Sequence, residues 1–237
     1  MKAIILAAGE GTRLGEIGKS CPKCLIRIGN KAIIERQIEA LNSNGIKDIS
    51  VVTGYYADRV REALKNAEVK FYLNKYYGKT GMLESLFCAR DELNDATILL
   101  YSDVIFKPNL IKNLLEDKND FCLVVDHKKG VKGDTKVKIF DDVVEDISKN
   151  LSLEESSGNY VGISKFSKKA ITTIYNRINA LIDNGKIKKY PSPSYLFKWL
   201  IDNGHKIHVV YADDSLYEEI DYEEDLDKAK EKFGLFS

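Results

Sequence analysis

Two glycines and two cations near the start of the chain could together hold a phosphate group. Gly9 and Gly11 directly follow an apolar run that predicts a buried strand, and glycines there let backbone N–H groups approach an anion closely. Arg13 can donate two parallel hydrogen bonds to a phosphate, and Lys23, which follows Pro22, adds a point charge for the same group. This segment, the glycine loop, predicts a nucleotide-phosphate site.

Other interpretations of the glycine loop stay open. In GEGTRLG the third glycine stands one place too late for the dinucleotide fingerprint G-x-G-x-x-G, which leaves an oxidoreductase as an alternative with an incomplete motif. The Walker pattern G-x-x-x-x-G-K-[ST] does not occur in the sequence. A glycine-rich turn beside a solvated arginine is the purely structural alternative.

Two aspartates far apart in the chain could hold a divalent metal ion. Mg²⁺ takes oxygen ligands and is usually held by one or two carboxylates together with substrate phosphates. Asp103 follows the apolar run TILLYS, at the strand end where such sheets bind ligands, and Asp221 ends the segment LYEEID. A helix N-cap or a turn is the alternative role for Asp103, and an N-cap is the alternative for Asp221. The glutamates near Asp221 are expected to form a solvated face, and they are Glu218, Glu219, Glu223 and Glu224.

Strand-length apolar runs alternate with segments of helical spacing in the first half of the chain. The predicted strands are Lys2 to Ala7, Asp48 to Thr53, Val69 to Leu73, Thr97 to Tyr101 and Phe121 to Val125. The predicted helices are Ala32 to Leu41, Asp58 to Leu64, Met82 to Glu92 and Asn109 to Leu115. This alternation predicts an α/β sheet with crossover helices, which would bring the glycine loop and Asp103 to one edge.

The pattern changes after Asp126. Short strands joined by polar turns are predicted at Lys136 to Phe140, Val143 to Ile147 and Asn159 to Phe166, as in an antiparallel extension that grips a second substrate. The remaining predicted elements are helices at Lys168 to Asp183, Ser194 to Asp202 and about Glu223 to Lys232, and a strand at Lys206 to Tyr211.

The amino-acid composition limits the classes of binding partner that we expect for this protein. The 237 residues include 36 basic and 36 acidic side chains, so the formal net charge is zero and nothing global favours a nucleic acid or a membrane surface. The apolar run Ala3 to Ala8 is too short for a signal sequence or a membrane span. We therefore expect a cytoplasmic protein whose four cysteines are reduced thiols.

Several longer segments carry a family resemblance. LAAGEGTRL followed by PK, then KAIIERQIEAL, GIKDISVVTGY and EEIDYEEDLDKA, resembles the nucleoside-triphosphate transferases that activate sugar phosphates and small phosphorylated alcohols. The resemblance spans nearly the whole chain. NKYYGKTGMLESLFCARDEL and LLYSDVIF are similar to the small cytidylyltransferases that act on phosphocholine, phosphoglutamine, inositol phosphate or aminoalkylphosphonates.

This resemblance implies a fold and a function for each successive part of the chain. The fold would be α/β, with a Rossmann-like, mixed and mostly parallel sheet flanked by helices and a small antiparallel substrate-binding extension. One domain would cover residues 1–237. Within it, residues 1–125 would mainly bind the nucleotide, residues 126–220 would mainly bind the acceptor, and residues 221–237 would form the C-terminal helix.

The resemblance also implies site residues. The base and ribose would face Ala7, Ala8 and Gly9, and the triphosphate would meet Gly11, Thr12 and the two catalytic residues Arg13 and Lys23. Two further nucleotide-binding segments would contribute Gly54 with Tyr55, and Asn74 with Thr80, Gly81 and Ser85. For Tyr55, an aromatic ring that closes a strand end is an equal alternative. The implied ligands of the Mg²⁺ cofactor are Asp103 and Asp221.

The implied reaction is attack by a phosphate or phosphonate oxygen of the acceptor on the α-phosphorus of the nucleotide, in line with the leaving pyrophosphate. Because a phosphate monoester has a second pKa near ~6, this nucleophile is ionised at neutral pH and needs no general base. CTP is the favoured donor. Sugar-1-phosphate transfer from UTP, dTTP or GTP is an alternative, and a non-catalytic nucleotide-binding regulatory protein is an alternative of another class.

The acceptor would be small and anionic, in a pocket predicted at Asp126, Lys138 and Tyr160. Lys138 alternates with apolar neighbours in a short predicted strand and could therefore point toward the cleft. In much of the family a glutamate precedes the aromatic of the motif Y-x-G-I, but here Asn159 precedes Tyr160. Choline, amino-acid and phosphonate acceptors therefore stay open, as does a homo-oligomer.

Overall fold

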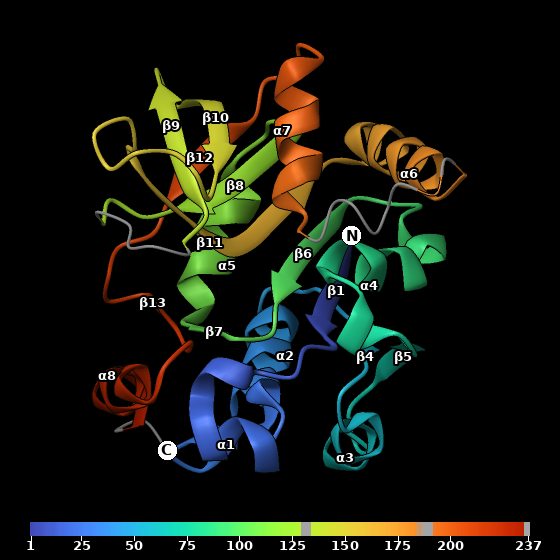
Figure 1. The fold of residues 1–237 in the computed structure, drawn as a ribbon, viewed down its shortest axis with the longest axis vertical. Helices are drawn as coiled ribbons and strands as arrows, with labels where there is room; N and C mark the ends of the chain where they lie inside the picture. The colour runs from blue at the N-terminus through green and yellow to red at the C-terminus, as the bar shows by residue number, and fades with distance from the viewer. Residues whose placement is uncertain (129–133, 184, 186–191, 235–237) are drawn as a thin grey trace.

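The computed structural model describes residues 1–128, 134–183, 185 and 192–234. Within these ranges, nine strands form one sheet in the spatial order β5-β4-β1-β6-β11-β8-β12-β10-β9 (Figure 1). The nine are β1 (Lys2–Ala7), β4 (Asp48–Thr53), β5 (Val69–Leu73), β6 (Thr97–Tyr101), β8 (Phe121–Val125), β9 (Lys136–Phe140), β10 (Val143–Ser148), β11 (Gly158–Phe166) and β12 (His208–Tyr211). Only β11 and β10 run against the common direction, so the sheet is mixed and mostly parallel, as predicted.

Two short strand pairs lie outside this sheet. β2 (Arg27–Ile28) pairs with β3 (Lys31–Ala32), and β7 (Val104–Phe106) pairs antiparallel with β13 (Tyr217–Glu219). β7 follows β6 after a tight turn, whereas β13 comes from near the end of the chain. The second pair therefore joins two segments that are far apart in the sequence.

Helices connect the strands and cover the sheet (Figure 1). They are α1 (Gly15–Ser20), α2 (Ile33–Ser43), α3 (Ala57–Ala63), α4 (Met82–Cys88), α5 (Pro108–Glu116), α6 (Lys168–Asp183), α7 (Ser194–Asp202) and α8 (Glu223–Phe233). α2 packs against α5 and β7, α4 packs against β1, β4 and β5, and α7 lies along β10. None of the described helices is both long and apolar enough to span a lipid bilayer.

The position of β11 differs from the prediction. This strand was expected in the antiparallel extension, but it lies inside the main sheet between β6 and β8. All nine of its residues are buried, which requires cover on both faces of the strand. The first residues of β11 do pair antiparallel with β9, as in the predicted extension, and β9 and β10 form the edge of the same sheet.

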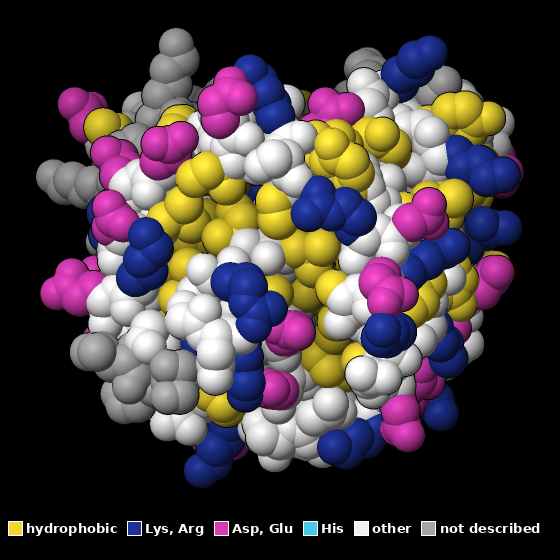
Figure 2. All heavy atoms as spheres, turned by 90° about the horizontal axis from the view of Figure 1, so that it is seen from below, with side chains coloured by type: hydrophobic (Ala, Val, Ile, Leu, Met, Phe, Trp, Pro, Cys, Tyr) yellow, Lys and Arg dark blue, Asp and Glu magenta, His cyan; other side chains and the backbone are white. Residues whose placement is uncertain are grey.

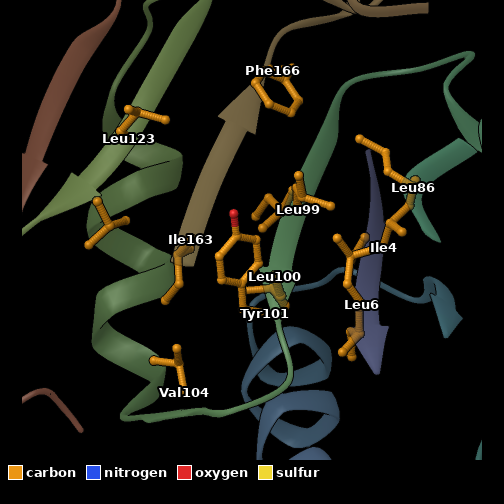
Figure 3. Close-up of a cluster of buried hydrophobic side chains, with 14 of the residues drawn as sticks. Ile4, Leu6, Leu86, Leu99, Leu100, Tyr101, Val104, Leu123, Ile163 and Phe166 are labelled. Atoms are coloured by element: carbon orange, nitrogen blue, oxygen red, sulfur yellow. The ribbon is translucent and has the colours of Figure 1, made fainter. Parts of the chain in front are cut away.

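The large hydrophobic core is built from neighbouring strands of the sheet (Figure 3). Ile4 and Leu6 of β1 lie beside Leu99 of β6, and Leu123 of β8 is on the same face of the sheet, whereas Ile163 of β11 is opposite Leu100 and belongs to the other face. All five side chains are buried. Burial of apolar surface on this scale is the main force that stabilises the folded sheet.

A smaller hydrophobic cluster lies apart from the large one, and we call it the second core. It gathers apolar side chains from both ends of the chain, namely Leu14, Ile26, Ile28, Ile33, Ile105, Ile220, Leu226, Ala229 and Phe233. These residues belong to the segments around α1, β2, α2, β7, β13 and α8. The second core therefore holds α8 and β13 against the region that carries the glycine loop.

Glu92 ties together two strands near their amino ends. Its carboxylate accepts hydrogen bonds from Lys2 of β1 at 2.8 Å, from Tyr72 of β5 at 2.6 Å and from Lys70 of β5 at 3.1 Å. Burial opposes ionisation of this side chain, but these bonds outweigh it and lower the pKa of Glu92 to about 2. Charged Glu92 therefore stabilises the folded protein.

We expect Glu92→Gln to lower the free energy of unfolding at pH 7 by about 1–3 kcal/mol. Since folding lowers the pKa of Glu92, the difference between variant and parent should be complete above its ordinary pKa and shrink as the pH falls toward 2. Urea unfolding at several pH values measures this difference. Glu62→Gln, at an exposed ion pair with Lys65, is the control and should change the free energy by less than about 1 kcal/mol.

Candidate active site

The carboxyl ends of β1 and β6 reach the same edge of the sheet, which is the lower edge in Figure 1. The glycine loop follows β1, and Asp103 follows β6. The view from below shows acidic and basic side chains next to one another near the middle of this face, bordered by hydrophobic surface (Figure 2). The predicted phosphate loop and the first predicted metal ligand therefore share one edge.

Asp103, Glu219 and Asp221 form a cluster of carboxylates at this edge. Each offers an oxygen, and these oxygens lie within 4.8 Å of one another. The β7–β13 pair brings them together, because Glu219 is opposite Val104 and the Ile220 N–H donates to the Asp103 carbonyl at 2.8 Å. Neither aspartate has the alternative role of a helix N-cap, since Asp103 lies in a turn between strands and the N-cap of α8 is the residue after Asp221.

Two cations face the carboxylate cluster. An Nη of Arg13 lies 2.5 Å from an Oδ of Asp221, Lys23 also pairs with Asp221, and Lys23 Nζ lies 3.6 Å from Asp103. Burial raises the pKa of Asp103, with Lys23 opposing and Asp221 adding to the shift. Burial and the charges of Asp103 and Asp221 raise the pKa of Glu219 to about 8. The carboxylates repel one another and require positive charge.

The cluster has the chemistry of a Mg²⁺ site. All three ligand groups are carboxylates, which are the oxygen donors that Mg²⁺ prefers. The Oδ1 atom of Asp103 is buried and has no hydrogen-bond partner, and a buried polar atom of this kind normally has one. A divalent cation would supply it, so the residues present fit the metal.

A cavity of about 220 Å³ lies beside the cluster at the glycine loop. Of the predicted nucleotide, phosphate and metal residues, its lining includes Ala7, Ala8, Gly9, Gly11, Thr12, Arg13, Lys23, Ser85 and Asp103. The structure therefore brings the main predicted donor-site residues around one space.

Gly11 explains how the glycine loop and Lys23 fit together. Its φ of 65° lies in the left-handed region, which glycine adopts without strain. A Cβ at this position would lie 2.8 Å from Cγ of Lys23. A side chain at Gly11 would therefore displace Lys23 from the carboxylates.

The other predicted nucleotide segments lie farther out. Gly54, Tyr55, Asn74, Thr80 and Gly81 are absent from the lining of this cavity. The amide of Asn74 donates to Thr80 and Ser85, each at 3.0 Å, so Asn74 organises the loop between β5 and α4. The Tyr55 hydroxyl donates to the carbonyl of Lys19 at 2.8 Å and so contacts the end of α1.

A second cavity of about 340 Å³ adjoins the first, and we call it the acceptor cavity after the acceptor-binding role predicted for two of the residues that line it. Arg13 and Asp103 line both cavities. Asp126 and Tyr160 line the acceptor cavity as predicted, but Lys138 does not. On β9 the buried face belongs to Val137, so strand alternation puts Lys138 outside, where it pairs with Glu145 at 2.9 Å. Its predicted position in the pocket is wrong.

Sequence reasoning did not predict the contacts that three residues make at this site. Glu219 joins the carboxylate cluster, although its acidic neighbours suggested a solvated face. Tyr217 donates to Asp126 at 2.5 Å. Gln37 supports the turn at Asp103 from α2. A signal for Glu219 was its alternation with apolar Ile220 in LYEEID, which is typical of a strand.

Comparison with known families agrees with this geometry. The model of the MobA-like NTP transferase domain matches residues 3–230. The chain belongs to the MobA-like NTP transferase family. It is therefore a nucleotidyltransferase, and the sequence resemblance is confirmed at this level.

Curated relatives of this transferase include enzymes named for CTP. The CTP:phosphoglutamine cytidylyltransferase of Campylobacter jejuni is 30% identical, over 98% of this chain and 100% of the relative. The choline-phosphate cytidylyltransferase of Streptococcus pneumoniae is 35% identical, over 52% of this chain and 53% of the relative. The mannose-1-phosphate guanyltransferase of Yarrowia lipolytica is 30% identical, over 76% of this chain and 48% of the relative.

Solved structures share the fold of the transferase. The CTP:phosphocholine cytidylyltransferase of Streptococcus pneumoniae has a TM-score of 0.82 at 23% identity, over 97% of each chain. The inositol-1-phosphate CTP transferase of T. maritima has a TM-score of 0.81 at 22% identity, over 98% of this chain and 94% of the other.

Gln37 holds the turn that presents Asp103. Its side chain is 1% exposed, and Nε2 donates to the carbonyls of Tyr101 at 2.8 Å and Val104 at 2.7 Å. These two carbonyls bracket the turn that contains Asp103. The transferase therefore fixes a predicted metal ligand from a buried amide on α2.

We expect Gln37→Met to lower kcat or Mg²⁺ affinity about 10- to 100-fold, because a side chain of similar length would then leave the turn unsupported. Mg²⁺ titration of pyrophosphate release measures this effect. Asn44→Leu is the matched control, because Asn44 at the end of α2 also donates to two backbone carbonyls, at 2.8 Å and 3.1 Å. Equal kcat and equal Mg²⁺ dependence in both variants and the parent would exclude this role for Gln37.

Proposed function

We propose that the transferase moves a cytidylyl group from CTP to a small acceptor that carries a phosphate or phosphonate, and releases pyrophosphate. The carboxylate cluster with Arg13 and Lys23 carries this proposal, because it lies where the two cavities meet. A donor in one cavity and an acceptor in the other would come together there. The relatives named as cytidylyltransferases support the choice of donor.

The residues at this junction suit the transfer of a charged group. Arg13 and Lys23 would exchange their pairs with Asp221 for the phosphates of the nucleotide, and so offset the charge that develops on pyrophosphate as it leaves. The backbone of the glycine loop would hold the triphosphate in line with the acceptor oxygen. That oxygen is already ionised at neutral pH, so the site needs no general base.

Asp103 and Asp221 would hold Mg²⁺, with Glu219 beside them. When bound, the ion would neutralise phosphate charge and orient the nucleotide. The proposal includes this role of Mg²⁺, the assigned site residues and a cytoplasmic location. It also includes that residues 1–125 mainly bind the nucleotide and residues 126–220 mainly bind the acceptor.

A second candidate is transfer to a sugar 1-phosphate from UTP, dTTP or GTP. It is favoured by relatives such as the guanyltransferase of Yarrowia lipolytica. The glycine loop alone does not separate the bases.

The deciding experiment measures pyrophosphate release from CTP, UTP, dTTP and GTP. Each nucleotide is offered with phosphocholine, phosphoethanolamine, inositol phosphate, glucose 1-phosphate or 2-aminoethylphosphonate, with Mg²⁺ or with EDTA. We expect Mg²⁺-dependent release with CTP and one of the non-sugar acceptors. Release with another nucleotide and a sugar phosphate would favour the second candidate.

A further inference from the structure

The acceptor cavity has an excess of negative side chains. Its lining contains eight carboxylates and four cationic side chains. Three of the four cations already pair with carboxylates, Arg13 with Asp221, Lys128 with Asp214 and Lys228 with Asp225. Two further cations outside the lining, Lys23 and Lys232, pair with Asp221 and Glu218. The balance of charge therefore differs from one acid of this wall to the next.

Asp126 is the most buried acid in this wall, with 3% of its surface exposed. It accepts hydrogen bonds from the Tyr217 hydroxyl at 2.5 Å, from the Asn159 backbone at 2.8 Å and amide at 3.1 Å, and from the Lys128 backbone at 3.1 Å. All four donors are neutral groups. Within the described part of the chain, no ion pair involves Asp126, so protein cations do not balance its charge.

Three tyrosines line the same cavity, namely Tyr101, Tyr160 and Tyr217. The rings of Tyr101 and Tyr160 lie 5.6 Å apart at an interplanar angle of 85°. The faces of aromatic rings carry partial negative charge and attract cations. The ring of Tyr217 already attracts a cation, since Lys128 Nζ lies 4.7 Å from its centroid.

Asn159 adds to the wall an oxygen that can accept a hydrogen bond. Its side-chain nitrogen donates to Asp126 and to the carbonyl of Lys128, whereas its Oδ1 is buried without a hydrogen-bond partner. Asn159 is 8% exposed and lines the cavity. A ligand that donates a hydrogen bond, or that brings positive charge, would satisfy this oxygen.

From these contacts we infer that the acceptor carries a positively charged nitrogen, which lies among Asp126, Asn159 and the tyrosine rings while its phosphate or phosphonate faces Arg13. This inference rests on the proposed function and narrows its acceptor to amines and quaternary ammonium compounds. Neutral polyols and sugars would leave the charge of Asp126 without a counterion.

The test compares acceptors that have the same shape but differ in charge. Phosphocholine is paired with 3,3-dimethylbutyl phosphate, and phosphoethanolamine is paired with propyl phosphate, each with CTP and saturating Mg²⁺. We expect the charged member of at least one pair to have a kcat/KM about 30-fold higher or more. The pair with the larger ratio distinguishes a quaternary from a primary nitrogen.

Asp126→Asn should bring the kcat/KM of the charged acceptor to within about 3-fold of that of its neutral partner, because the amide keeps the shape of the side chain but loses its charge. Asp202→Asn, at an exposed ion pair on α7, is the matched control and should leave the ratio unchanged. The comparison in the unaltered protein does not depend on whether Asp126→Asn folds.

Equal or higher kcat/KM for both neutral members would overturn the inference while leaving cytidylyl transfer intact. A second divalent ion on Asp126 would also give equal ratios, and would add a second step to the Mg²⁺ dependence. If another nucleotide proves to be the donor, the proposed function fails and the same pairs are measured with that nucleotide. If no acceptor reacts, calorimetric binding of each pair decides the inference without turnover.

Discussion

Asp103→Asn should lower kcat at least about 1000-fold and leave the protein at least as stable as before. Asp103 is half-buried beside Asp221 and Glu219, and this burial raises its pKa. A carboxyl group whose pKa rises on folding destabilises the folded state as the pH rises above its ordinary pKa. Asparagine keeps the shape and removes the repulsion, but it is a weaker metal ligand. Function and stability should therefore change in opposite directions.

Turnover is measured by pyrophosphate release and stability by thermal unfolding without Mg²⁺. Asp202→Asn is the control, since it removes an exposed carboxylate far from the cluster and should change neither quantity greatly. Near-normal turnover in Asp103→Asn would rule out Asp103 as an essential metal ligand. A large loss of stability would instead give it a structural role.

Lys23→Met should also remove most activity, with kcat about 100- to 1000-fold lower, because Lys23 is the buried cation between the glycine loop and the carboxylates. Its effect on stability should have the opposite sign to that of Asp103→Asn. Without Lys23, Arg13 is the one cation among the described residues that still forms an ion pair with the cluster, so the free energy of unfolding should fall by about 2 kcal/mol in EDTA.

Added Mg²⁺ distinguishes the role of Lys23 in stabilising the carboxylates from its role in activity. If the ion binds the carboxylates, it should raise the melting temperature of Lys23→Met more than that of the unaltered protein, while activity stays low. Lys19→Met is the control, because Lys19 is an exposed lysine of α1 that pairs only with Glu16 in the described structure. A melting temperature of Lys23→Met that does not respond to Mg²⁺ would contradict the metal assignment.

The sequence predicted the bounds of the strands around the glycine loop well, because the apolar side chains of each strand are enough to show where it begins and ends. The bounds of β1, β4 and β6 agree with the prediction, since each is an apolar run of strand length between polar segments. The place of β11 could not be predicted in this way. A run of buried residues fits any interior position, and only pairing with both β6 and β8 determines which one.

Where one segment of the chain brings the predicted residues together, as at Gly11, Arg13 and Lys23, they line one cavity, and their roles stay a prediction. Glu219 was missed because β13 is three residues long, and its strand form depends on pairing with β7. The error at Lys138 has a related cause. Alternation predicts that neighbouring residues face opposite ways, but it does not tell which face lies toward the cavity.

The second core gives the active site a stability separate from that of the sheet. Glu219 and Asp221 are held in place by β13 and α8, which pack on a small cluster of apolar side chains. Such units can open without global unfolding. An excursion that releases α8 would separate Asp221 from Asp103 while the nine strands stay paired. The fraction of competent enzyme would then follow this local equilibrium, and hydrogen exchange in α8 would report it ahead of exchange in β1 and β6.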